Sequence, residues 1–146
     1  MSVRVVLDVS ALRGYAEIDR ALAVGELVRL VREDSIDDHV GVPAAAFVSA
    51  FTTTGEDGRE LLSAIVADAE LATMRQDPRQ TAFALLALPE ADLLHVGTLE
   101  VAWPGRGHAV VEAQRHGAVL ATFEPCEVDG LTVIDLSASW DEQDEG

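Results

Sequence analysis

The residue whose type and position most clearly suggest chemistry is Asp8. It lies near the end of a predicted strand, Val3–Val9, whose residues are apolar on both faces, as in a buried parallel strand, and Ser10 follows closely. In open α/β sheets, ligands and metals bind at the carboxyl ends of the strands. Asp8 is therefore the first candidate for a functional carboxylate, although it could equally be a structural acid that accepts hydrogen bonds from nearby backbone amides.

Strands and helices are predicted to alternate along the chain. Apolar and β-branched runs predict further strands at Val40–Pro43, Leu93–Val96, Val119–Thr122 and Leu131–Ile134. Helical spacing of apolar residues predicts helices at Glu17–Arg32, Ala44–Phe51, Glu60–Ala72, Gln80–Leu88 and His108–His116, with a turn at Ser10–Tyr15. This alternation predicts an α/β fold, a three-layer α/β/α sandwich with a mostly parallel central sheet.

The length of 146 residues fits one domain, which we expect to span residues 1–136. The acidic tail, residues 137–146, is expected to be disordered, with Trp140 holding its first turn. The net charge is −16, from 10 Lys+Arg against 26 Asp+Glu, and it repels phosphate backbones. RNA is therefore disfavoured as a general partner.

Cys126 is the only cysteine, so no internal disulfide can form and a reducing compartment fits. The N-terminus shows no charged and apolar leader, and apolar runs such as Val42–Phe51 are shorter than the ~20 residues of a membrane span. We expect a soluble cytoplasmic protein without a membrane partner.

Four segments together resemble a PIN domain: "VVLDVSAL", "VGVPAAAFVSAF", "HAVVEAQRHGAVLATFEP" and "GLTVIDL". The resemblance covers essentially the whole chain. It implies a Mg²⁺- or Mn²⁺-dependent ribonuclease, the activity of many PIN domains and of the toxins in toxin–antitoxin pairs. In that family three or four acids converge on the carboxyl edge of the sheet, because hard cations are held by several carboxylate oxygens.

The resemblance assigns two of those acid positions to Asp8 and Glu124. The other two positions depart from the family. Ser49 stands where a glutamate is usual, and it could hold only a metal-bound water. His108 stands in the place of the third acid, and Glu112, one turn later on the same helix face, could substitute for it.

A first shell with two carboxylates predicts no bound metal or weakly bound Mg²⁺/Mn²⁺. Asp8, His108 and Glu124 could instead form a mixed imidazole–carboxylate site for Mn²⁺ or Zn²⁺. The ordinary alternatives are that His108 is a surface or capping residue and that Glu124, before a proline, belongs to a turn. The sequence Gly105–Gly107 is a partial phosphate-loop motif and also a common way to enter a helix.

Two hypotheses about function follow. In the favoured one, a PIN-like protein with a partly dismantled nuclease site acts without catalysis, in binding or regulation, through a protein partner or a homodimer. The alternative is a Mg/Mn-dependent ribonuclease of the toxin–antitoxin type that uses Asp8 and Glu124, with Arg106 and Arg115 available for local phosphate contacts. The resemblance also suggests pairing through helices, with Gln80–Leu88 as a candidate surface.

Overall fold

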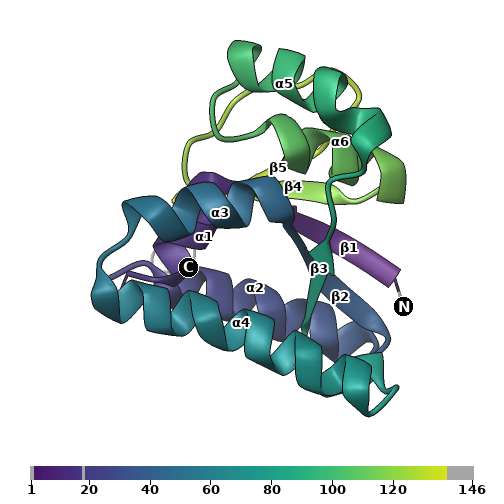
Figure 1. Cartoon of the computed structure of the whole chain (residues 1–146). Coiled ribbons are helices and arrows are strands. Elements are labelled where there is room, and N and C mark those ends of the chain that lie inside the picture. The colour runs from purple at the N-terminus through teal and green to yellow at the C-terminus, as the bar shows by residue number, and fades with distance from the viewer. Residues whose placement is uncertain (1, 18, 138–146) are drawn as a thin grey trace, which may run out of the picture.

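The computed structural model describes residues 2–17 and 19–137. A five-stranded sheet forms its centre, and every neighbouring pair of strands is parallel, in the order β3-β2-β1-β4-β5 (Figure 1). The strands are β1 (Ser2–Leu7), β2 (Asp38–Pro43), β3 (Phe83–Leu86), β4 (Val119–Thr122) and β5 (Val133–Asp135). The helices are α1 (Val9–Tyr15), α2 (Ala21–Asp34), α3 (Ala44–Thr53), α4 (Glu56–Met74), α5 (Leu93–Ala102) and α6 (Gly107–His116), with 3₁₀ turns at Pro78–Gln80 and Glu90–Asp92. The predicted three-layer sandwich with a parallel sheet is confirmed.

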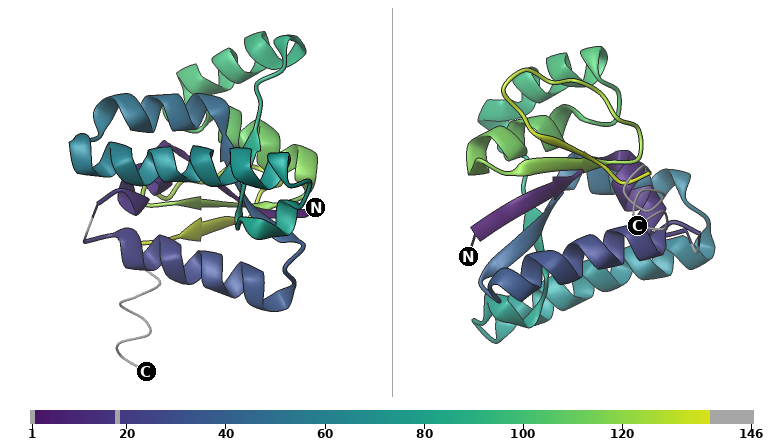
Figure 2. Two further views of the ribbon diagram at one scale, coloured as in Figure 1. Left: turned by 60° about the horizontal axis from the view of Figure 1, so that its bottom comes forward. Right: turned by 180° about the vertical axis from the view of Figure 1, so that it is seen from behind.

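The strand β1 divides the core into two halves because its side chains alternate between the two faces of the sheet. Val5 and Leu7 pack in a cluster with residues of α1, α2, α3 and α4, whereas Val6 packs in a second cluster with residues of α6. Figures 1 and 2 show α5 and α6 on one side of the sheet and α2 and α4 on the other. Both faces of the central strands are therefore covered, as parallel sheets require.

The same strand delivers Asp8 to the carboxyl edge of the sheet. β1 lies between β2 and β4, and Leu7 is the register partner of Ala121. The residues that follow these two, Asp8 and Thr122, consequently meet at one edge. The predicted strand at Val119–Thr122 is confirmed, and Gly117 ends α6 in the left-handed conformation with φ of 61°.

The segment predicted as a turn, Ser10–Tyr15, is wrong, because it belongs to helix α1. The predicted strand is also too long at its end, since β1 stops at Leu7 and Asp8 becomes the N-cap residue of α1. A helix of seven residues is too short to show a clear period in the sequence. Its start is fixed instead by the side chain of Asp8.

Two further predictions of secondary structure are wrong: a predicted helix is a strand, and a predicted strand is a helix. Gln80–Leu88 is not a helix, since its centre is strand β3, paired in parallel with β2 from Val40 to Pro43. Leu93–Val96 is not a strand, since it opens helix α5. The spacing of apolar residues in a short run does not distinguish a helix from a strand, so contacts with residues distant in the sequence determine which one forms. The helical pairing surface suggested at Gln80–Leu88 is therefore absent.

The predicted tail, beyond Ser137, lies outside the described residues, and so does Trp140. Within residues 2–17 and 19–137, no helix combines the length and the apolar character needed to cross a membrane.

Candidate functional site

The carboxylate of Asp8 is buried and already holds the start of α1. Its residue is 2% exposed, and its Oδ1 accepts hydrogen bonds from the backbone N–H of Ala11 at 2.9 Å and from the hydroxyl of Ser10 at 2.8 Å. Burial raises the pKa of Asp8, while hydrogen bonds from Thr122, Ala11 and Ser10 and the charge of Arg106 oppose that rise. One of the two carboxylate oxygens is thus committed to structural hydrogen bonds.

The other oxygen of Asp8 faces Arg106. The Nε of Arg106 lies 3.3 Å from Oδ2 of Asp8, and its Nη2 lies 4.0 Å from Oε2 of Glu124. The side chain of Arg106 is 11% exposed, whereas that of Glu124 is 72% exposed. Because the Nε of Arg106 is buried and has no hydrogen-bond partner of good geometry, its attraction to Asp8 is mainly that of opposite charges. A permanent cation of the chain therefore lies between the two predicted acids.

The loop that carries Arg106 is held from both sides. The carboxylate of Glu100, on α5, accepts hydrogen bonds from the backbone N–H groups of Gly105 at 2.5 Å and Gly107 at 2.8 Å. The carbonyl of Gly105 accepts from the N–H of Val9, at the start of α1, at 3.0 Å. Gly105 has φ of +84°, which glycine adopts without strain. These bonds place Arg106 at the sheet edge, next to Asp8.

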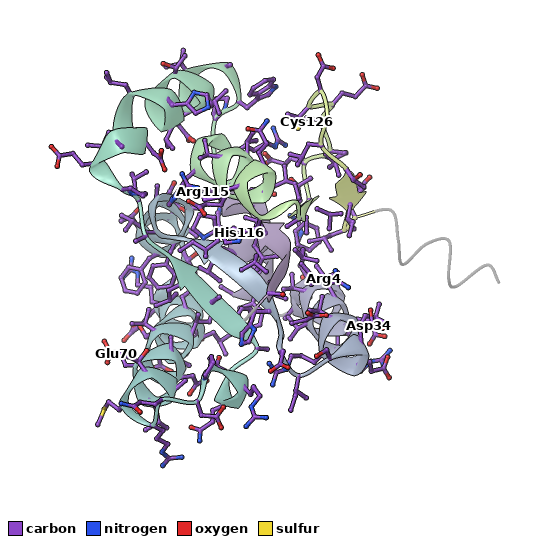
Figure 3. The ribbon with its side chains drawn as sticks, turned by 90° about the vertical axis from the view of Figure 1, so that its right-hand side faces the viewer. Arg4, Asp34, Glu70, Arg115, His116 and Cys126 are labelled. Atoms are coloured by element: carbon purple, nitrogen blue, oxygen red, sulfur yellow. The ribbon has the colours of Figure 1, made fainter. Side chains whose placement is uncertain are left out.

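His108 and Glu112 form a second, separate cluster on α6. The Nδ1 of His108 accepts from the backbone N–H of Ala45, in the first turn of α3, at 3.2 Å, and its Nε2 lies 3.3 Å from Oε1 of Glu112. Glu112, with a side chain 3% exposed, also contacts Arg115 at 2.5 Å and His116 at 3.3 Å. Figure 3 shows Arg115 and His116 at the end of α6. The carboxylate of Glu112 is thus surrounded by cationic or imidazole partners of its own helix.

His108 is therefore not a surface residue, and no polar contact among the described residues joins its ring to Asp8. It is 2% exposed, and its ring caps a helix that is distant in sequence. Ser49 lies on α3 and is exposed, and its backbone carbonyl accepts from the hydroxyls of Thr52 and Thr53. Among the described residues, no polar contact joins the side chain of Ser49 to Asp8 or Glu124.

The five predicted site residues thus fall into different places. Arg106 links Asp8 to Glu124, His108 and Glu112 contact each other, and Ser49 stands apart. Over residues 2–17 and 19–137, no group of three or more His, Cys, Asp or Glu side chains is arranged to hold a metal ion. A divalent ion shared by Asp8 and Glu124 would have to displace the guanidinium of Arg106, so the residues present do not fit Mg²⁺ or Mn²⁺ at this point.

Arg106 is the site residue whose role the sequence interpretation missed. Its position between two glycines suggested a phosphate contact, whereas its side chain contacts carboxylates of its own chain. The available signal was its place just before α6, at the same sheet edge as Asp8. Arg115 likewise pairs with acids, Glu112 and Asp92, rather than lying free for phosphate.

Comparison with protein-family models and with curated proteins found no match to this sequence. The fold and the site together define a parallel α/β protein in which an arginine of the same chain lies between two carboxylates at the sheet edge.

Proposed function

We propose that this chain is a PIN-like protein with a partly dismantled nuclease site, and that it acts without catalysis as a binding or regulatory protein. The observation that carries the proposal is the guanidinium of Arg106, 3.3 Å from Asp8 and 4.0 Å from Glu124. A cation shared by Asp8 and Glu124 would have to lie where this guanidinium lies.

Arginine cannot replace that cation in hydrolysis. A divalent metal lowers the pKa of a bound water and presents it to the phosphorus, whereas a guanidinium remains protonated and offers only N–H donors. Asp8 has also lost its coordinating freedom, because its Oδ1 accepts from Ser10 and Ala11. Arg106 offsets one of the two negative charges, and it does not supply the chemistry that requires a metal.

The electrostatics of the chain favour a protein partner over RNA. The net charge of −16 opposes approach of a polyphosphate chain. Arg106 and Arg115, which the alternative hypothesis would use for RNA, both contact acids of the chain. We expect the protein to bind no metal, or to bind Mg²⁺ or Mn²⁺ only weakly.

The test is incubation of the protein with a fluorescently labelled single-stranded RNA in Mg²⁺ and in Mn²⁺. We expect no cleavage above the level of Asp8→Asn. Asp38→Asn is the matched control, because Asp38 opens β2 at the opposite, amino end of the strands. Metal-dependent cleavage that Asp8→Asn abolishes and Asp38→Asn retains would overturn the proposal in favour of the ribonuclease.

A further inference from the structure

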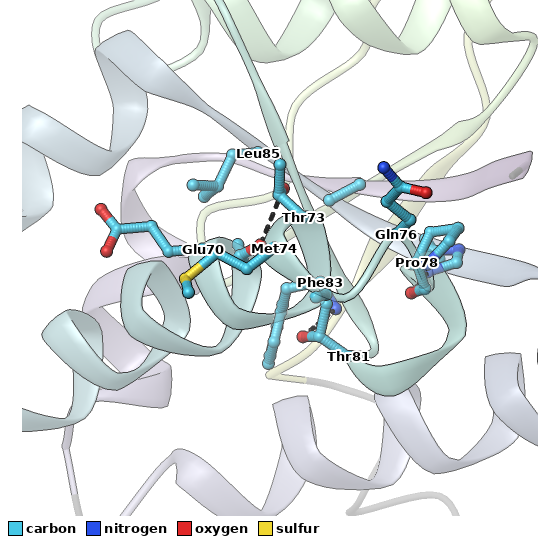
Figure 4. A pocket seen from close by; sticks show the side chains of 12 residues that line it. Glu70, Thr73, Met74, Gln76, Pro78, Thr81, Phe83 and Leu85 are labelled. Carbon is cyan, nitrogen blue, oxygen red and sulfur yellow. Dashed lines mark hydrogen bonds between the residues drawn. The ribbon is translucent and has the colours of Figure 1, made fainter.

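An apolar groove lies between the C-terminal half of α4 and the edge strand β3. Its volume is about 810 Å³, and its apolar lining includes Ala69, Met74, Phe83 and Leu85 (Figure 4). Met74 is 80% exposed and Leu85 is 43% exposed, so apolar side chains there are open to solvent. A groove of this size accommodates several side chains of a bound segment.

The backbone of β3 is unpaired on the side of the sheet away from β2. β3 is the last strand in the sheet order, and the carbonyl of Ala82 accepts from the N–H of Val40 at 2.9 Å. The backbone N–H and C=O groups of successive residues in a strand point to opposite sides. Those of Ala84 and Leu86 therefore also point to β2, whereas those of Phe83 and Leu85 point outward. The hydroxyl oxygen of Thr81 accepts a hydrogen bond from the backbone N–H of Phe83 at 3.2 Å. The carbonyl of Phe83 and both backbone groups of Leu85 therefore have no strand partner within the described chain.

This edge has only one of the usual protections against strand addition, its short length of four residues. Proteins commonly blunt edge strands with a very short strand, lysine, proline, inward charges or bulges, and β3 contains neither a charge nor a proline. The sequence of β3 is FALL, and its register with β2 runs without a break from Phe83 to Leu86. An open, regular edge next to an apolar groove is the arrangement that accepts an added strand, with backbone hydrogen bonds along the edge and side-chain pockets beside it.

We propose that this groove, formed by α4 and β3, binds an extended basic peptide segment of a partner protein as a sixth strand of the sheet. The net charge of the whole chain, rather than the charge of the groove itself, favours a basic occupant, since Arg79 beside the groove pairs with Asp77. Apart from His39, Glu70 is the only ionisable residue that lines the groove, and the whole chain carries −16. A second copy of the chain brings the same large negative charge, and residues 138–146 contain four acids and no base. Both of these would be repelled by the negative charge of the chain, whereas a basic segment would be attracted to it.

The inference rests on the binding role proposed above and names its partner class. Its test uses Leu85, far from Asp8 in the sequence, so the two proposals can fail separately. Loss of the peptide site would leave the absence of nuclease activity unchanged, and RNA cleavage at Asp8 would leave peptide binding at β3 unchanged.

The experiment measures fluorescence anisotropy with a labelled ten-residue peptide library that alternates Arg/Thr with Val/Ile/Leu/Phe. We expect saturable binding to the wild-type protein. Leu85→Pro, which removes an outward N–H that β2 does not use, should weaken binding at least tenfold. Leu94→Lys is the matched control, because Leu94 on α5 is 88% exposed and does not line the groove. It should bind like the wild type.

A second probe separates the backbone contribution. The same library with N-methyl groups on alternate amides cannot complete the strand pairing and should bind at least tenfold more weakly. Absence of saturable binding by 1 mM peptide would overturn the proposal, and so would equal binding by Leu85→Pro in a folded protein. A wild-type dimer in sedimentation that Leu85→Pro dissociates would assign the edge to a second copy instead.

Discussion

Replacement of Arg106 by methionine should destabilise the fold through Asp8. The guanidinium and the carboxylate are 3.3 Å apart, and their side chains are 11% and 2% exposed. Coulomb's law gives about 5 kcal/mol for unit charges at this separation with an effective dielectric constant of about 20. Desolvation of both groups offsets much of that attraction. We therefore expect a coupling free energy of about 1.5–3 kcal/mol between the two residues.

The assay is a double-mutant cycle in urea, with Arg106→Met, Asp8→Asn and the double variant. Asparagine retains the ability to cap α1, so Asp8→Asn removes the charge with little loss of the helix start. Arg106→Met alone should lower the free energy of unfolding by about 3 kcal/mol, because it leaves a buried carboxylate without its counter-charge. In the Asp8→Asn background, the same replacement should cost much less.

The control is the same cycle at Arg4 and Asp38, which are 3.2 Å apart, with the side chain of Arg4 60% exposed and that of Asp38 11% exposed. Solvent reaches the guanidinium of Arg4 and screens its charge, so the coupling of this pair should be smaller, about 0–1 kcal/mol. If Arg106→Met and Asp8→Asn were additive to within about 0.5 kcal/mol, the reasoning about the neutralised carboxylate would be refuted.

Three further outcomes are expected. Burial raises the pKa of Asp8 above its ordinary 3.8, so the stability of the wild type relative to Asp8→Asn should fall as the pH rises from about 3.8 through the raised pKa. Urea melts that show a pH-independent difference between the two proteins would contradict this. Glu112→Gln, at a carboxylate with three partners, should cost about 1.5–3 kcal/mol in urea unfolding, against about 0.5 or less for Gln114→Ala on the exposed face of the same helix. In thermal scans Gly97→Ala should stabilise the protein by about 0.5–1 kcal/mol, since nothing lies within 4 Å of the added carbon on α5. Gly107→Ala should destabilise the protein, since the added carbon would lie 2.5 Å from a backbone carbonyl of α5, and the reverse order of the two variants would be inconsistent with this packing.

The central part of the fold could be predicted because its signals are contiguous in the sequence. The run from Val3 ends in an acid and a small hydroxyl, and the segment at Val119 follows a helix that ends in glycine. Both strands are buried on two faces, so their composition identifies them without knowledge of their partners.

The errors at β3 and α5 have a different physical origin. β3 contains four residues and exists as a strand because it pairs with β2, about forty residues earlier. α5 exposes Leu94 and Val101, at 88% and 85%, so its apolar residues do not mark a buried helix face. In both segments the decisive contacts, or their absence, are not encoded in the local pattern.

At the candidate site, the sequence predicted the position of Asp8 but not the partners of the site residues. Asp8 was expected at the sheet edge and lies there. The contact of His108 with Ala45 and that of Arg106 with Asp8 join segments far apart in the chain. A sequence pattern that assigns acids to a metal does not reveal that an arginine of the same chain contacts both of them.

Calorimetric titration of Mn²⁺ into the wild type and into Arg106→Gln measures whether Arg106 excludes a divalent ion from Asp8 and Glu124. We expect no saturable heat for the wild type up to millimolar Mn²⁺. We expect weak saturable binding for Arg106→Gln, because Asp8 and Glu124 then lack their cation, and loss of that binding in the double variant with Asp8→Asn. Saturable binding of Mn²⁺ by the wild type below millimolar concentration, abolished by Asp8→Asn, would contradict this expectation.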